Sequence, residues 1–153
     1  MEEKVVRISV RSLVEFIFRE GDIDNRISGN MDSALMQLGS KIHRKIQKRM
    51  GSAYRAEVPL KIQIPVVGFI LQIEGRADGI LEDENQVMID EIKGVMKELT
   101  NISEPIGVHL AQARCYAYIY ALQNHREKIV VQLTYCNLET EEIKRSISTP
   151  HPL

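Results

Sequence analysis

The segment from Ile73 to Gly94 constrains the fold of this chain more than any other. Two runs rich in β-branched residues flank the polar stretch Asp83–Gln86, which is the pattern of a β-hairpin. Strand alternation places Glu91 and Lys93 on one face, at the end of an apolar row, and the first run brings Asp78 to the same end of the hairpin. An apolar strand face rarely ends in such charges unless a ligand is bound there. The pattern predicts a divalent-metal site, with a solvated hairpin as the alternative.

The residue types at this end of the hairpin suit metal-assisted chemistry. Hard cations such as Mg²⁺ prefer oxygen ligands, and carboxylates on rigid strands supply them with little ordering cost. Lys93 points the same way as Glu91, so it can orient a nucleophile and stabilise developing negative charge. The like charges of Asp78 and Glu91 are expected to repel one another in a partly desolvated pocket, and Lys93 offsets only part of that repulsion.

The length and composition predict one soluble globular domain. The chain has 153 residues, 44% of them hydrophobic and 27% charged. We expect the domain to span residues 1–148, with 149–153 as a tail or the start of a linker. No apolar run approaches the ~20 residues that cross a bilayer, and the start Met1-Glu2-Glu3 is no signal peptide, so we expect a cytoplasmic protein without a membrane partner. A net charge of −1 argues against a general nucleic-acid coat protein but not against a local basic groove.

Two helices are predicted in the first third of the chain. Apolar residues at helical spacing within Val5–Arg19 predict a short helix, with Ser9 as its N-cap and Gly21 at its end. Met31–Met50 carries a longer apolar stripe, and Gly51 closes that helix.

The second helix is also the most basic part of the chain. Between Ser40 and Ala56 there are basic residues and no acid. These residues are Lys41, Arg44, Lys45, Lys48, Arg49 and Arg55. Such a run forms either a solvated face or, in a nuclease, a flank that binds phosphates. Both interpretations stay open from the sequence.

Strand signals dominate the remainder, apart from one helix. The predicted strands are Tyr54–Ile64 (ended by Pro65), Phe69–Leu81, Val87–Lys93, Lys128–Cys136 and Glu142–Ser148. Glu57, in the first of them, is either a solvent-facing glutamate or an extra acid near the site. We expect Val95–Gly107 to be a short helix and loop near the mouth of the site. Val108–Gln123 predicts a helix that puts Gln112 and Tyr116 on one face.

The motifs together resemble the PD-(D/E)XK nuclease superfamily, and within it the RecB-like branch that includes CRISPR-associated and helicase-linked nuclease domains. They occur in the family's order and cover about residues 8–148. These motifs are Gly39-x-x-x-His43, Asp78, Glu91-Ile92-Lys93 and Gln112-x-x-x-Tyr116. The chain departs from the superfamily pattern at Ala77, where many members have proline before the acid.

The resemblance implies an α/β fold with a restriction-endonuclease-like αβββαβ core, in which helices flank a central mixed sheet. It implies a divalent-metal-dependent DNA nuclease that attacks in line with the leaving 3′ oxygen and leaves 5′-phosphate ends. Such a protein is an exonuclease in DNA repair or recombination, or the amino-terminal domain of a helicase–nuclease, with DNA and a helicase domain or subunit as partners. The alternative is an inactive DNA-binding module of the same fold within a larger complex.

The resemblance also assigns roles to residues. His43, Asp78, Glu91 and the Ile92 carbonyl would hold one or two Mg²⁺ or Mn²⁺ ions. Lys93 would act on the nucleophile, while Gln112 and Tyr116 steady the lysine or the DNA backbone. The expected DNA contacts rest on charge and position and not on a family motif, apart from Tyr116. These residues are Lys41, Arg44, Lys45, Lys48, Arg49, Arg114 and Tyr116, with His109 as a further candidate.

The two cysteines bear on the cofactor. Several relatives carry an iron–sulfur cluster, which takes four cysteine ligands. This chain has only Cys115 and Cys136, both in apolar contexts that predict buried thiols. We therefore expect no iron–sulfur cluster.

Overall fold

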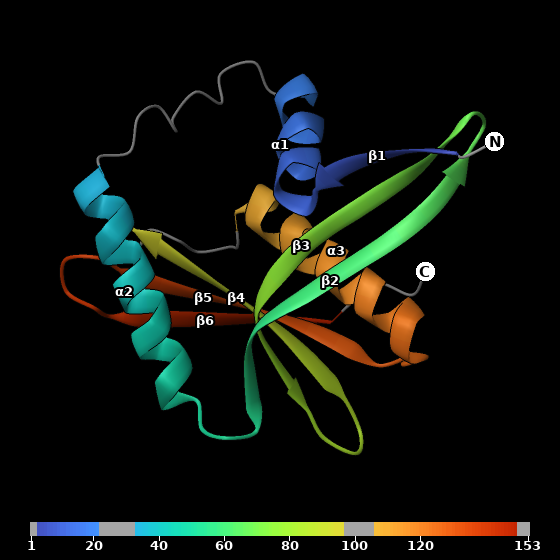
Figure 1. Ribbon diagram of the computed structural model, residues 1–153. Helices are drawn as coiled ribbons and strands as arrows, with labels where there is room; N and C mark the ends of the chain where they lie inside the picture. The colour runs from blue at the N-terminus through green and yellow to red at the C-terminus, as the bar shows by residue number, and fades with distance from the viewer. Residues whose placement is uncertain (1–2, 22–32, 97–105, 150–153) are drawn as a thin grey trace.

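The computed structural model describes residues 3–21, 33–96 and 106–149. A mixed six-stranded sheet lies between helices (Figure 1). The elements are β1 (Lys4–Ser9), α1 (Val10–Gly21), α2 (Ser33–Arg49), β2 (Tyr54–Val66), β3 (Phe69–Glu82), β4 (Val87–Val95), α3 (Gly107–Asn124), β5 (Ile129–Asn137) and β6 (Ile143–Ser148). From α2 to β5 the order is αβββαβ, so the predicted fold class is confirmed.

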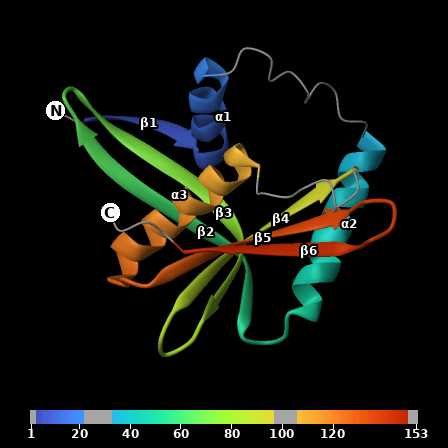
Figure 2. The same ribbon diagram turned by 180° about the vertical axis from the view of Figure 1, so that it is seen from behind.

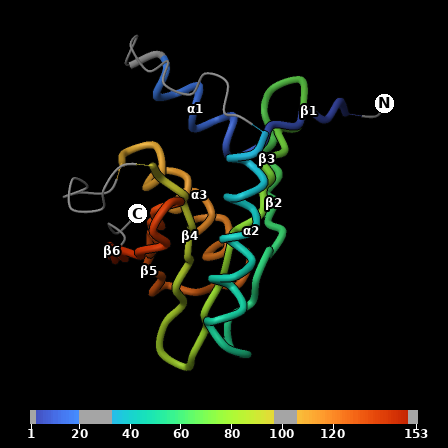
Figure 3. The backbone as a smooth tube through the Cα atoms, turned by 90° about the vertical axis from the view of Figure 1, so that its left-hand side faces the viewer, coloured from blue at the N-terminus to red at the C-terminus, as the bar shows by residue number. Residues whose placement is uncertain are grey.

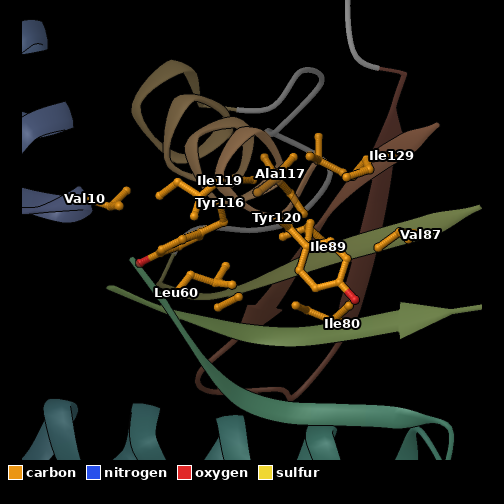
Figure 4. Packing of buried hydrophobic residues seen from close by; sticks show 14 of the residues in the cluster. Val10, Leu60, Ile80, Val87, Ile89, Tyr116, Ala117, Ile119, Tyr120 and Ile129 are labelled. Atoms are coloured by element: carbon orange, nitrogen blue, oxygen red, sulfur yellow. The ribbon is translucent and has the colours of Figure 1, made fainter. Parts of the chain in front are cut away.

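Different helices pack against the two apolar faces of the sheet. On one face, Ile42 and Ile46 of α2 pack against Ile92 of β4 and Leu138 beyond β5. On the other, α1 and α3 share the larger cluster with the strands (Figures 2 and 4). Residues on both sides of β4 are buried, which explains why this strand reads as an almost continuous apolar run.

Strand β3 is the centre of the sheet and has different neighbours along one edge. β2 pairs antiparallel with β3 along almost its whole length. On the other edge, β1 pairs in parallel with residues 69–74, and β4 pairs antiparallel with residues 79–82. The last pair between β3 and β4 is Gly79 with Asp90, after which β4 continues beside β5 (Figure 3). We call this point of divergence the fork.

The N-terminal prediction is wrong in one respect. Val5–Ser9 belongs to a strand and not to the first helix, because its β-branched residues pair in parallel with β3. Local periodicity carries no signal of that distant partner. The predicted cap is confirmed, since the Ser9 hydroxyl accepts a hydrogen bond from the Ser12 backbone N–H at 3.0 Å and α1 begins at Val10.

The other boundaries agree to within a few residues. Pro65 does not end β2, which continues to Val66, because an edge strand tolerates a missing donor. The hairpin turn is closed by Asp83, whose Oδ1 accepts the backbone N–H groups of Asn85 and Gln86. Most of the predicted segment Val95–Gly107 and of the tail lies outside the described residues.

Two further findings concern the cysteines and the helices. Both cysteines are free thiols, Cys136 buried and Cys115 partly buried. Within the described residues, no helix combines the length and the apolar character that a membrane crossing requires.

Candidate active site

Asp78 and Glu91 meet at the fork, as the hairpin pattern predicted. They are the chain neighbours of Gly79 and Asp90, the last paired residues of β3 and β4. Asp78 Oδ2 accepts the backbone N–H of Ile92 at 2.7 Å, so a side chain on β3 takes up a donor of β4 where the ladder has ended. The acids therefore sit where the sheet opens.

The Asp78 carboxyl is stabilised in its ionised form. Burial opposes ionisation, but the His43 ring, the neighbouring Glu91 carboxyl and the Ile92 N–H together lower the pKa of Asp78 below its ordinary value. His43 Nδ1 lies 3.6 Å from Asp78 Oδ1, which is a contact of ion-pair range but longer than a hydrogen bond.

The Glu91 carboxyl has the opposite behaviour. Burial, followed by the hydrogen bond to Asp78 and the charge of Asp78, raises the pKa of Glu91 well above its ordinary value, and Lys93 offsets only part of this. The predicted repulsion between the two carboxyls therefore acts mainly against the ionisation of Glu91. Its side chain is 2% exposed, and its Oε2 atom has no hydrogen-bond partner among the described residues. An unpartnered buried oxygen of this kind is an acceptor without a donor.

Lys93 is held from the opposite side by α3. Its Nζ donates to Gln112 Oε1 at 2.9 Å, so the predicted helical face does meet the end of the hairpin. Tyr116, one turn further on, is 3% exposed and lies against Gly75 of β3, where an added Cβ would come within 2.8 Å of its ring. Because so little of Tyr116 reaches the surface, its position suits support of Gln112 better than direct contact with DNA.

The side chains of the site do not form a complete ligand shell. Within the part of the chain that the structure describes, no three His, Cys, Asp or Glu side chains are grouped as around a metal ion. Asp78 accepts the backbone N–H of Ile92, and the ionised form of Glu91 is disfavoured by burial. The unpartnered Oε2 of Glu91 nevertheless fits a cation, because a divalent ion displaces the proton and supplies the missing partner.

Gln47 of α2 connects Glu57 to the site, a contact that no sequence pattern indicated. The Gln47 amide nitrogen donates to Glu57 Oε1 at 3.0 Å and to the Asp78 carbonyl at 2.9 Å. Glu57 has a left-handed backbone (φ 55°), a strained conformation for a non-glycine residue. Glu57 itself is exposed, so both earlier interpretations hold in part: it faces solvent beside the site.

The basic residues of α2 divide into two groups. Lys45 Nζ lies 2.7 Å from Glu141 Oε1, and the charges of Lys41 and Arg49 also act on Glu141. Arg44 and Lys48 follow His43 and Gln47 directly in sequence, so they form the exposed basic stripe next to the residues that face Asp78. Only this second group flanks the fork.

An open pocket near the fork contains two further basic residues, Lys61 and Arg76. It lies on β2 and β3 and is lined by Pro59, Leu60, Lys61, Glu74, Gly75 and Arg76. Arg76 is exposed and stands two residues before Asp78.

Arg114 and His109 are placed differently from one another. Arg114 is exposed on the turn of α3 opposite Gln112 and does not join the site. His109 Nδ1 lies 3.1 Å from the hydroxyl of Tyr135, the residue of β5 paired with Lys93.

Asp90 is the main residue that sequence reasoning missed. It is 1% exposed and takes hydrogen bonds from Tyr54 (2.7 Å), Thr134 (2.6 Å) and Gln132 (3.3 Å). The available signal was the polar pair Gln132 and Thr134, two residues apart within an otherwise apolar strand.

Comparison with known proteins establishes the fold and not the function. No protein-family model matches the chain, and no curated protein matches it. Among solved structures it is similar to the crystal structure of SSO0001, with a TM-score of 0.65 and 23% sequence identity over 100% of this chain and 70% of that one. At this identity the likeness concerns the backbone arrangement alone.

Proposed function

We propose that this chain is a divalent-metal-dependent DNA nuclease of the PD-(D/E)XK superfamily, RecB-like branch. One observation carries the proposal: the Oε2 atom of Glu91 is buried without a partner, beside Asp78 and near Lys93. Burial and the neighbouring Asp78 both disfavour the ionised form of Glu91 in this desolvated fork. The arrangement is explained if a cation takes the place of the proton.

The residues around that atom are those expected to hold the ion. Asp78 and Glu91 would supply carboxylate oxygens, with the Ile92 carbonyl and His43 as additional ligands. When bound, Mg²⁺ or Mn²⁺ polarises the phosphate and lowers the pKa of a coordinated water.

The protein's own contribution centres on Lys93. An ammonium has three donors, and Gln112 accepts one of them. The others remain to orient the attacking water and to hold charge on a phosphate oxygen as the bond to the 3′ oxygen breaks. Gln112 thus fixes the direction of Lys93, and the buried Tyr116 behind it limits the movement of both.

Positive charge beside the fork supports a nucleic-acid substrate. Arg44 and Lys48 flank the site from α2, and Lys61 and Arg76 line the pocket on the β2–β3 ribbon. Phosphate contacts of this kind give affinity without sequence preference. We extend the proposal to action alone or together with a helicase domain or subunit.

A second candidate is an inactive DNA-binding module of the same fold. It is favoured by the lack, among the described residues, of a grouped set of three metal-ligating side chains. The two candidates agree on DNA binding and differ on cleavage.

Cleavage assays separate the candidates. The protein is incubated with single- and double-stranded DNA labelled at the 5′ or 3′ end, in Mg²⁺, Mn²⁺ or chelator. We expect metal-dependent products with 5′-phosphate ends, and loss of cleavage in Lys93→Ala and Glu91→Gln.

Matched controls are Lys128→Ala and Glu84→Gln, since both residues are exposed and lie at the opposite end of the hairpin and β5. Both should cleave like the wild type. DNA binding without metal-dependent cleavage would favour the inactive module, and near wild-type cleavage by folded Lys93→Ala would refute the assigned mechanism.

A further inference from the structure

We propose that Tyr54 is a positioning residue for the acid pair: its hydroxyl holds Asp90 and thereby fixes where β4 leaves β3. The consequence for cleavage rests on the proposed function, whereas the structural effect does not. No motif includes Tyr54, Gly79 or Asp90, and the inference comes from their contacts alone.

The contact joins two strands that are not neighbours. Tyr54 begins β2, which pairs with β3 and with no other strand of the described residues, yet its hydroxyl donates to Asp90 Oδ2 on β4 at 2.7 Å. The Tyr54 side chain therefore crosses β3. Both residues are buried, 6% and 1% exposed, so water does not substitute readily for this hydrogen bond.

Gly79 makes the crossing possible. A Cβ atom built on Gly79 would lie 1.8 Å from Tyr54 Cζ and 1.9 Å from its hydroxyl oxygen, so any other residue would displace the ring. Gly79 and Asp90 are also the last pair of the β3–β4 ladder. The Tyr54 side chain thus reaches from β2 across β3 to β4, at the last pair between β3 and β4.

Because of its location, the Tyr54–Asp90 contact affects the positions of Asp78 and Glu91. Asp78 immediately precedes Gly79 and Glu91 immediately follows Asp90, so both acids lie just beyond the last pair of the ladder, where Tyr54 bonds to Asp90. Beyond that point, the strands are connected by the hydrogen bond from Ile92 N–H to Asp78 Oδ2 and by the contact between the Asp78 and Glu91 carboxyls. A shift of Asp90 changes the separation of the two carboxyls directly.

The remaining bonds of Asp90 do not replace this one. Thr134 and Gln132 both donate to the other oxygen, Oδ1, and both are on β5. They hold β4 to its parallel neighbour, which moves with it. Among the three donors, only Tyr54 ties β4 to the β2–β3 ribbon.

Tyr120 provides a matched control. It too is a buried tyrosine, 4% exposed, whose hydroxyl donates to a carboxylate, Glu82 Oε2, at 2.8 Å. Glu82 lies at the far end of β3, four residues beyond Asp78. The Tyr120 hydroxyl also accepts a hydrogen bond from Arg55 at 2.8 Å, and its bond to Glu82 is only partly buried. Tyr54→Phe and Tyr120→Phe therefore remove the same chemical group at different distances from the fork.

The experiment compares these two variants by amide hydrogen exchange and by cleavage kinetics. In Tyr54→Phe we expect the Ile92 amide to exchange faster by on the order of tenfold, the scale of one buried hydrogen bond. We also expect kcat to fall about 10- to 100-fold with KM for DNA unchanged, since small displacements of reacting groups act on the chemical step. Tyr120→Phe should leave both quantities at wild-type values.

A second variant guards against failure to fold. Asp90→Asn keeps the shape of the side chain but has one acceptor oxygen, whereas the carboxylate has two. It should therefore show the same faster exchange and lower kcat, each to a smaller extent. The proposal is overturned if the Ile92 amide in both Tyr54→Phe and Asp90→Asn exchanges as it does in Tyr120→Phe. If the wild type does not cleave DNA, the proposed function fails, and the exchange rates still decide the role of Tyr54.

Discussion

The Asp78 side chain accepts the backbone N–H of Ile92 at 2.7 Å, across the point where β3 and β4 separate. This hydrogen bond joins Asp78 to the neighbouring strand and favours its ionised form, whereas burial and the charge of Asp78 disfavour the ionised form of Glu91. The two carboxyls therefore have unequal roles before any ligand binds, and this inequality leads to separate predictions for each.

The first prediction concerns pH and Glu91. Its pKa in the folded protein is raised, so its contribution to stability is complete below the unfolded value of about 4.5 and is lost as pH rises through the folded pKa. In chelator, the wild type should lose stability from about pH 5 upward, by at most about 1.4 kcal/mol per pH unit. Glu91→Gln should remove this slope in thermal melts, whereas Glu84→Gln should keep it. An unchanged slope in Glu91→Gln would contradict the assignment.

The second prediction concerns Asp78 and metal. Simple repulsion would make Asp78→Asn stabilising, but the lowered pKa of Asp78 means that its ionised form is favoured in the fold. Without metal, we expect Asp78→Asn to lower the free energy of unfolding at neutral pH by about 1–2 kcal/mol. Mg²⁺ or Mn²⁺ should raise the melting temperature of the wild type and that of the variant much less. An equal metal response in both proteins would remove Asp78 from the proposed ligands.

The third prediction concerns the hydrogen bond between Gln112 and Lys93. Gln112→Leu has a similar size but offers Lys93 no acceptor. We expect kcat to fall about 10- to 100-fold and to remain above that of Lys93→Ala, because the lysine is present but less well oriented. Gln123→Leu, on an exposed part of the same helix, is the control. Its amide donates to the Lys61 carbonyl and not to Lys93, so this variant should keep the wild-type kcat. A Gln112→Leu enzyme with wild-type kcat would show that Lys93 needs no such support.

The fourth prediction divides the basic helix. Replacing Arg44 and Lys48 with glutamine should weaken binding to unrelated DNA sequences by the same factor. The slope of the logarithm of the binding constant against the logarithm of salt concentration (the salt slope) should fall by the amount that about two phosphate contacts contribute. Replacing Lys41 and Lys45 instead should have a smaller effect, since Lys45 is paired with Glu141. Both double variants lose the same charge, so equal salt slopes would mean that the position of the charges on α2 does not matter.

The sequence determined by itself those features that depend on near neighbours along the chain. The Asp83 turn, the alternation that aligns Glu91 with Lys93, the Ser9 cap and the shared face of Gln112 and Tyr116 are all local. Backbone periodicity and turn chemistry act over a few residues, so they are visible in the order of amino acids. For the same reason the αβββαβ order was predictable.

The tertiary structure alone decided the features that need a partner far along the chain. Val5–Ser9 forms a strand because the edge of β3 is available for pairing. Lys45 forms an ion pair because the turn before β6 brings Glu141 beside it. Asp90 is buried because Tyr54 and Thr134, distant in sequence, supply its donors. Which of the two carboxyls ionises more readily depends on burial and on the Ile92 N–H, and burial exists only once the sheet has formed.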